Sequence, residues 1–167
     1  EVEGRIWDRV EEFDSRFQRD DFLRIRGKAS LYLGKMQVVV QDLEAVPEEE
    51  VDLSEFLPVS ERSSEELITA FHDQVARVKD PDYRKLLEAF AADESFLHKF
   101  SLAPAAKSMH HAYLGGLLEH SLAVAELAVE IGRRYEGVDT DLLLAGALLH
   151  YIVKTEELAY LRSFEYT

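Results

Sequence analysis

The sequence predicts a mainly α protein, in which a small β module precedes a helical domain. Apolar and charged residues alternate around a glycine turn in the first part of the chain, which is typical of paired strands. Apolar residues at helical spacing, each group preceded by capping residues, follow in the last part. An acidic stretch with two prolines separates them. We therefore expect a β module at 1–46, a linker at 47–62 and a helical domain at 63–167.

The predicted β module centres on a hairpin at Leu33-Gly34-Lys35. Before this turn, charged residues alternate with Leu23, Ile25 and Gly27, and after it the sequence reads "MQVVVQDLEAV". The opening "EVEGRIWD" predicts a further strand, and "RVEEFDSRF" predicts a helical turn. Three strands are too few for a closed β domain, so we expect the module to be part of a small barrel.

The helical domain is marked by its capping residues. Ser63 and Glu66 have the spacing of a capping box, and Asp80-Pro81 is typical of a helix start. A shorter helix is expected in "DESFLHKFSLAP". After Gly115-Gly116 we expect a long apolar helix to about Tyr135, and then a last helix, capped by Asp139 or Thr140, over "DLLLAGALLHYIVK".

The composition limits the classes of protein to which the chain can belong. It has 167 residues, of which 47% are hydrophobic and 31% charged, a balance typical of folded domains. It has no cysteine, no apolar run that predicts a membrane helix and no recognisable signal peptide, so we expect a cytoplasmic protein. The net charge of −14 argues against nonspecific binding to phosphate backbones. Residues 5–41 are the exception, with eight Lys and Arg against six Asp and Glu.

Histidines are concentrated in the helical domain. His110 and His111 precede the double glycine, while His120 and His150 lie in strongly apolar helical segments. An imidazole on such a face requires a hydrogen bond or a metal ion. A lone helical histidine is usually a satisfied core residue, but two of them with a further pair nearby also fit a metal site. The residues alone leave both interpretations open.

At these residues the sequence resembles the HD-domain metal-dependent phosphohydrolases. The similarity lies in "HHAYLGGLLEHSLAVAELA" and "DLLLAGALLHYIVKTEEL". It implies that His120 and His150 are metal ligands, that Lys154 stabilises phosphate charge, and that His110 and His111 assist. The expected cofactor is a divalent metal, Mn²⁺ or Mg²⁺. Glu119, beside His120, is expected to face solvent or support a ligand.

The chain departs from the family pattern at two motif positions. Tyr151 stands where the family has Asp, and Val153 stands where it has Gly. A distant aspartate completes the family's ligand set, and no match to it is identified, so the helical domain is expected to be truncated at its C-terminal end. A phenol supplies neither the charge nor the bridge of a carboxylate. We therefore expect this chain to bind metal weakly or not at all.

The front module adds a basic face. Arg24, Arg26 and Lys28 alternate along one strand, and Tyr32 and Lys35 lie at the turn. Basic residues with an aromatic residue are typical of single-strand binding by OB-fold sheets, although a solvated sheet face fits as well. The front also resembles the OB-fold of YhaM-like 3′–5′ exoribonucleases, one branch of the HD family. That resemblance implies single-stranded RNA or DNA as partner, a homo-oligomer and no membrane.

Three functions remain open from the sequence. The first is an HD-type phosphodiesterase or 3′–5′ exonuclease that acts on single-stranded nucleic acid. The second is an inactive HD-fold module that binds nucleic acid or a nucleotide. The third is a structural helical domain whose histidines are core residues. Metal-dependent turnover distinguishes the first from the other two, and single-strand binding distinguishes the second from the third.

Overall fold

The computed structural model describes residues 2–159 and 165–166. The chain divides into two compact units, residues 1–52 and residues 53–167. The division falls inside the acidic stretch 47–62 that the sequence assigns to a linker. Within this stretch the chain forms two short 3₁₀ turns, Glu48–Glu50 and Leu53–Glu55.

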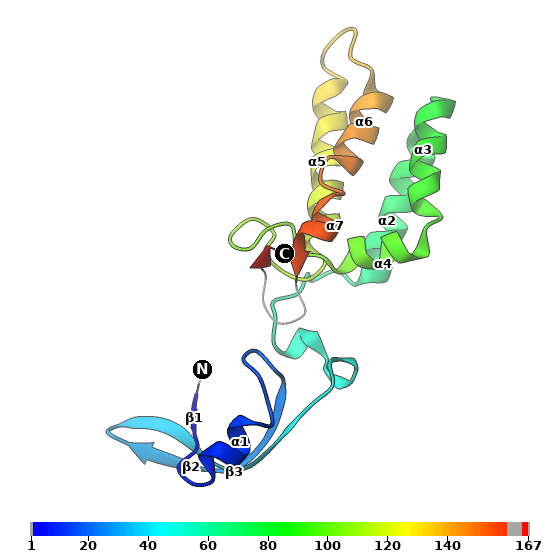
Figure 1. Ribbon diagram of the computed structural model, residues 1–167. Coiled ribbons are helices and arrows are strands. Elements are labelled where there is room, and N and C mark those ends of the chain that lie inside the picture. The colour runs from blue at the N-terminus through cyan, green and yellow to red at the C-terminus, as the bar shows by residue number, and fades with distance from the viewer. Residues whose placement is uncertain (1, 160–164, 167) are drawn as a thin grey trace. The chain divides into compact units, whose positions relative to one another are not determined.

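The front unit is a three-stranded sheet with one short helix (Figure 1). Its elements are β1 (Glu3–Arg5), α1 (Val10–Asp14), β2 (Leu23–Tyr32) and β3 (Lys35–Ala45). The central strand β3 pairs antiparallel with β2 and parallel with β1. The turn residues Leu33 and Gly34 both have positive φ, which is the backbone of a tight two-residue hairpin. The predicted hairpin is therefore confirmed.

A small core holds the front unit together. Phe13 of α1 is buried with Val40 and Leu43 of β3, and Ile6 and Phe17 pack at its edge. The helical turn predicted ahead of the hairpin thus supplies the largest buried side chain of this unit. Among the described residues the front sheet has three strands, and its assignment to an OB-fold remains a prediction.

The second unit is helical, as predicted (Figure 1). Its helices are α2 (Ser64–Arg77), α3 (Pro81–Ala91), α4 (Glu94–Leu102), α5 (Gly116–Gly132), α6 (Thr140–Leu149) and α7 (Lys154–Glu157). A two-stranded pairing of β4 (Leu158–Ala159) with β5 (Glu165–Tyr166) follows. The predicted caps are confirmed: Ser63 and Glu66 form a capping box, and Asp80 and Asp139 accept hydrogen bonds from the first turns of α3 and α6.

The two apolar helices end earlier than the sequence predicts. Helix α5 ends at Gly132 rather than near Tyr135, and α6 ends at Leu149 rather than continuing through "HYIVK". In α6 the reason is local. The His150 side chain donates from Nδ1 to the Ala147 carbonyl. In a continuing helix this carbonyl would accept from a backbone N–H of the next turn. After His150 the backbone instead forms the tighter i→i−3 hydrogen bonds.

The core of the helical unit lies among α2, α3, α4, α5 and α6. Helix α5 packs along α6 and also contacts α2 and α4 (Figure 1). The largest fully buried side chains are Phe71, Phe100, Leu67, Leu87, Leu117, Leu118, Leu122 and Leu148. Three of them, Leu117, Leu118 and Leu122, surround His120 in the α5 sequence. The helix that carries this histidine is therefore fixed in place by close packing.

In the part of the chain that the structure describes, no helix combines the length and the apolar character that crossing a bilayer requires.

Candidate metal centre

A short loop carries His110 and His111 to the start of α5. Gly115 has a φ of +83°, and Gly116 begins the helix. A Cβ atom added to Gly116 would lie 2.1 Å from the carbonyl oxygen of His111, so only glycine allows the loop to approach this closely. That carbonyl accepts a hydrogen bond from the backbone N–H of Ala105 at 3.1 Å. The double glycine of the sequence thus holds the His111 backbone against the helix.

The backbone of this loop is strained at the histidines. Met109 and His111 have φ values of +70° and +50°, in the left-handed region that non-glycine residues rarely adopt. Such strain persists only where the surroundings hold it, and it is frequent at functional sites. Here the His111 carbonyl and the Tyr113 carbonyl, which accepts from Gly116 N–H, provide that restraint.

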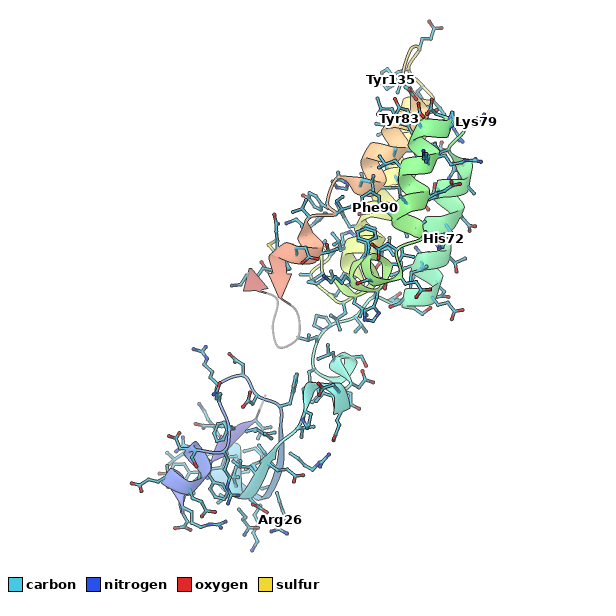
Figure 2. All side chains as sticks on the ribbon, turned by 45° about the vertical axis from the view of Figure 1, so that its right-hand side comes forward. Arg26, His72, Lys79, Tyr83, Phe90 and Tyr135 are labelled. Carbon is cyan, nitrogen blue, oxygen red and sulfur yellow. The ribbon has the colours of Figure 1, made fainter. Side chains whose placement is uncertain are left out.

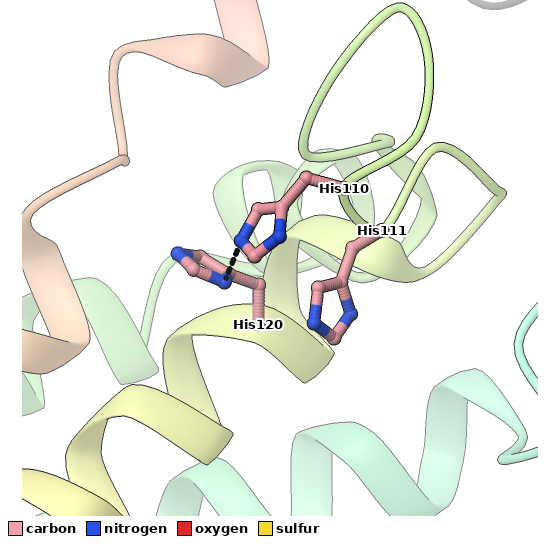
Figure 3. Close-up of side chains that lie close together, drawn as sticks. All are labelled: His110, His111 and His120. Atoms are coloured by element: carbon pink, nitrogen blue, oxygen red, sulfur yellow. Dashed lines mark hydrogen bonds between the residues drawn. The ribbon is translucent and has the colours of Figure 1, made fainter.

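Four imidazoles from three segments meet at this place. His120 comes from α5 and is 7% exposed, His150 caps the C-terminus of α6, and His110 and His111 come from the loop. His110 Nε2 lies 3.0 Å from His120 Nδ1, and His120 Nε2 lies 3.2 Å from His150 Nε2. Figure 3 shows the His110 and His111 rings facing His120. One ring nitrogen from each of these three residues lies within 4.8 Å of the others.

The hydrogen bonds assign the protons on two of these rings. His150 Nδ1 faces the Ala147 carbonyl at 2.6 Å, and because a carbonyl only accepts, this nitrogen carries the proton. His150 Nε2 is then an acceptor, and His120 donates to it from Nε2. His120 Nδ1 therefore holds a lone pair, directed toward His110. In this arrangement His150 supports His120 as a ligand, in the way that outer partners orient metal-bound imidazoles.

The surroundings of His120 keep its imidazole neutral. Burial, followed by the charges of His110, His150 and His111, lowers the pKa of His120 from 6.5 to about 4. A neutral imidazole is the form that binds metal ions.

Tyr151 lies against two of the histidine rings. Its ring stacks on His120 with centroids 5.1 Å apart and lies 4.3 Å from the His150 ring. Lys154 Nζ lies 5.2 Å from the centre of the Tyr151 ring and 3.6 Å from a carboxylate oxygen of Glu157. The lysine that the sequence assigns to phosphate is therefore near the histidine cluster, beside the tyrosine.

A second set of polar groups reaches the cluster from the side of the linker. His111 Nδ1 lies 2.7 Å from the hydroxyl of Tyr113, and Ser60 donates from Oγ to Glu119 at 2.8 Å. Burial first, and then the hydrogen bonding and charge of Glu119, raise the pKa of Tyr113 to about 12. Sequence reasoning missed Ser60 and Tyr113 as site residues, because no spacing rule relates either of them to His111.

The basic residues of the front hairpin lie in the other unit, 1–52. Arg24 pairs with Glu44 at 2.6 Å and Arg26 with Asp42 at 3.5 Å, each directly across the hairpin. Figure 2 labels Arg26 on this unit. Lys28, Tyr32 and Lys35 are exposed on the same two strands. Acidic partners across the hairpin thus offset part of the positive charge that the alternation predicts.

The donor set determines which metal ions this site fits. Among the described residues, the group close enough to share one ion consists of three imidazoles, His110, His111 and His120. Imidazoles bind Zn²⁺, Co²⁺ and Ni²⁺ well, whereas Mg²⁺ prefers carboxylate and water oxygens. This donor set suits a divalent transition metal better than Mg²⁺.

A comparison with known protein families finds a match in the part of the chain that carries His120 and His150. Residues 117–162 match the family model of the HD domain. The match begins at the buried start of α5 and includes His120 and His150. No solved structure matches the chain.

Proposed function

We propose that this protein is a metal-dependent phosphohydrolase whose metal centre is the histidine cluster. The observation that carries the proposal is the meeting of His110, His111 and His120 around one point, with His150 behind His120. The match of residues 117–162 to the HD domain supports it, because HD-domain proteins are generally metal-dependent hydrolases. The imidazole donors favour Zn²⁺ or Co²⁺. They should bind Mn²⁺ more weakly and Mg²⁺ most weakly.

The roles of the residues follow from their chemistry. A divalent metal, when bound, lowers the pKa of a bound water molecule and neutralises phosphate charge. The three imidazoles hold the ion, and His150 orients His120 by accepting its Nε2–H. Lys154, whose side chain is only 19% exposed, supplies a positive charge near the cluster for a phosphate oxygen. Tyr151 lies against the His120 and His150 rings, with ring centroids 5.1 Å and 4.3 Å apart.

The proposed substrate is a phosphodiester in single-stranded RNA or DNA. Lys28, Tyr32 and Lys35 are exposed on the front hairpin and offer two cations and an aromatic face. Cleavage from the 3′ end follows from the resemblance to the YhaM-like branch. The homo-oligomer and the cytoplasmic location implied by the sequence remain predictions.

A second function is favoured by one observation. Tyr151 stacks on His120 and lies against His150, at the position where the HD family has a carboxylate. A protein with this arrangement could bind a metal and nucleic acid without cleaving the strand. This alternative predicts single-strand binding without turnover.

The experiment that tests the proposal is cleavage of 5′-labelled single-stranded RNA by the purified full chain. Zn²⁺, Co²⁺ and Mn²⁺ are compared with EDTA, and His120→Ala is compared with His72→Ala, whose histidine lies on α2 (Figure 2). We expect metal-dependent shortening that His120→Ala abolishes and His72→Ala retains. Cleavage that EDTA or His120→Ala leaves unchanged would show that the histidine cluster is not the catalytic centre.

A Tyr151→Asp, Val153→Gly double variant separates the two functions. If the natural chain binds RNA without cutting it and only the double variant cuts, the binding-module function is correct. If neither chain cuts with any of the three metals, the proposed hydrolase function is wrong.

A further inference from the structure

The one tryptophan of the sequence lies exposed beside a cleft of the front unit. Trp7 follows β1 in the connection to α1, and it is 60% exposed. A single exposed apolar side chain requires no explanation by itself. Here, however, the ring adjoins a cleft and two arginines, and this combination is what a ligand would recognise.

The cleft beside Trp7 has a volume of about 220 Å³ and lies within the front unit. Trp7, Asp8 and Arg9 line it from the connection, Phe13 lines it from α1, and residues 39–41 line it from β3. Phe13 belongs to the buried core of this unit, so the cleft is built on packed side chains. Sites that enclose a whole small molecule measure roughly 300–1,000 Å³, and this smaller cleft therefore suits one ring of a larger ligand.

Arg9 holds the connection that carries Trp7. Its φ of +55° lies in the left-handed region, which a non-glycine residue keeps only where its surroundings hold it. Nη2 of Arg9 donates to the backbone carbonyl of Gln41 on β3 at 2.9 Å, and the guanidinium carbon lies 4.7 Å from the centre of the Phe13 ring. Backbone strain of this kind is frequent at functional sites. The wall of the cleft is thus fixed to the central strand.

Arg5 of β1 lies against the other component of the cleft, the Trp7 ring. Its guanidinium carbon is 5.8 Å from the ring centre, which is a cation–π distance. Nη2 of Arg5 donates to the exposed Glu3 carboxylate at 3.1 Å. Nε of Arg5 is buried and has no hydrogen-bond partner among the residues that the structure describes. Because an unsatisfied donor is costly, this guanidinium would gain from a further acceptor such as a phosphate oxygen.

The chemistry of these groups favours one kind of ligand. A flat aromatic ring beside a guanidinium is typical of proteins that bind single-stranded nucleic acid, because a base stacks on the ring and the cation attracts the phosphate. Residues 5–41 contain eight Lys and Arg against six Asp and Glu, although the whole chain has a net charge of −14. Phosphate is therefore repelled less by this segment than by the rest of the chain.

We propose that the cleft beside Trp7 is a base-binding site for single-stranded RNA or DNA. One base stacks on the Trp7 indole, and Arg5 contacts the adjacent phosphate. The inference rests on the proposed single-stranded substrate, and it adds a base contact in the β1–α1 connection to the exposed groups of the hairpin.

The test measures contact and affinity separately on the full chain, without added metal. Because the sequence has one tryptophan, its fluorescence reports on this cleft alone. The probe is an oligouridine RNA of about 12 nucleotides, a length within the site sizes of single-strand-binding modules. Quenching of Trp7 reports contact, and the fluorescence anisotropy of the end-labelled RNA gives the affinity.

The variants are Trp7→Leu, Trp7→Phe and Arg5→Gln. Tyr135→Leu removes an exposed aromatic ring of the helical unit and is the control for the ring. Arg19→Gln removes a charge whose side chain is 94% exposed in the front unit and is the control for charge. Trp7 is largely exposed, so its replacement should leave the fold intact, and thermal unfolding of each variant checks this.

We expect RNA to quench Trp7 and the affinity to fall about 5–150-fold in Trp7→Leu, which is the range for the loss of one base–aromatic stack. Trp7→Phe should retain much of the affinity, because a phenyl ring still stacks. Arg5→Gln should weaken binding and make it less sensitive to salt, because one phosphate contact is lost. Both controls should bind as the natural chain does.

The outcomes distinguish this inference from the proposed function. If RNA binds the natural chain and Trp7→Leu equally, or if Trp7→Phe loses as much affinity as Trp7→Leu, the base-stacking inference is wrong and the single-stranded substrate stands. If RNA binds as expected at Trp7 but no metal produces cleavage, the base site stands and the hydrolase function fails. If no RNA binds, both the inference and the proposed substrate are wrong.

Discussion

The front hairpin and the histidine cluster hold their polar side chains in different surroundings. On the hairpin, Arg24 and Arg26 are exposed, and each pairs with an acid directly opposite on the neighbouring strand. In the cluster, His120 is buried, and its partners come from a loop and from the end of another helix. Exposed pairs in water contribute little free energy, whereas buried polar groups strongly require their partners. The cluster is therefore the region where single substitutions should have specific consequences.

The cores beneath these two regions differ as well. Phe13, Val40 and Leu43 are the buried core of the front unit, whereas the helical unit buries a large continuous cluster that includes Phe71 and Phe100. A large core allows a helix to carry a buried imidazole, because the lost hydration is offset by many apolar contacts. This difference explains why the candidate metal centre is found in the helical unit.

The largest expected effect tests the core on which the cluster depends. Phe71 is fully buried in α2, and its ring makes an edge contact with Phe100 at 5.9 Å. We expect Phe71→Ala to lower the free energy of unfolding by about 3–5 kcal/mol, because it removes buried apolar surface and leaves a cavity. Urea unfolding measures the change. Leu127→Ala, at an exposed position of α5, is the control and should change stability by less than about 0.5 kcal/mol. Equal losses in the two variants would contradict the assignment of the core.

The second effect tests whether the cluster binds metal. We expect His120→Ala to reduce Zn²⁺ affinity by roughly 100-fold or more, equivalent to about 2.7 kcal/mol, because His120 contacts both His110 and His150. Isothermal titration of the full chain provides the measurement. His98→Ala removes an exposed histidine of α4 and should leave the affinity unchanged. Similar affinities in both variants would place the bound ion outside the cluster.

The sequence predicted the two regions to different extents. Capping residues and helical spacing located α2, α3 and α6, and the glycine turn located the hairpin, because these signals are local. The motif resemblance identified His120 and His150, but the stacking of Tyr151 on them depends on where α6 ends, which a side-chain hydrogen bond of His150 determines. Likewise, the alternation of Arg24 and Arg26 predicted a basic face, and the pairing with Glu44 and Asp42 requires the strand register.

The third effect compares two glycines of the helical unit. A Cβ at Gly116 would meet the His111 carbonyl at 2.1 Å, whereas a Cβ at Gly146 of α6 would meet nothing within 4 Å. We expect Gly116→Ala to cost about 1–3 kcal/mol and to displace the His111 loop. Gly146→Ala should instead stabilise α6 by about 0.5–1 kcal/mol, because alanine favours helix interiors. Thermal unfolding tests both variants, and the opposite signs distinguish a close backbone approach from ordinary helix propensity. A stabilising Gly116→Ala would contradict the loop geometry.

The fourth effect is a pH dependence of the metal-free protein. The folded-state pKa of His120 is about 4, below its ordinary value of 6.5, so the unfolded chain binds this proton more readily. Its contribution to stability is therefore present above pH 6.5 and is lost as the pH falls toward 4. One proton changes the free energy of unfolding by at most about 1.4 kcal/mol per pH unit.

Chemical unfolding at several pH values, with EDTA present, measures this dependence. The slope between pH 6.5 and 4 should be shallower in His120→Asn than in the natural chain, and His98→Asn should keep the natural slope. An unchanged slope in His120→Asn would show that the folded protein does not disfavour the imidazolium.

The smallest expected effect on stability lies in the front hairpin. Glu44→Gln breaks the ion pair with Arg24, but both side chains are exposed, so stability should change by less than about 0.5 kcal/mol. The same change leaves the Arg24 charge uncompensated. If the hairpin face binds single-stranded RNA, affinity at low salt should rise a few-fold and fall more steeply with added salt, because more phosphate charge is neutralised.

Glu11→Gln, on α1 of the same unit, makes the same change of net charge away from this pair and is the control. A rise confined to Glu44→Gln would locate binding on the hairpin, and an equal rise in both variants would indicate only the net charge of the unit. No rise in either would show that the paired face is a solvated surface, and the histidine cluster would then be the better candidate for contact with nucleic acid.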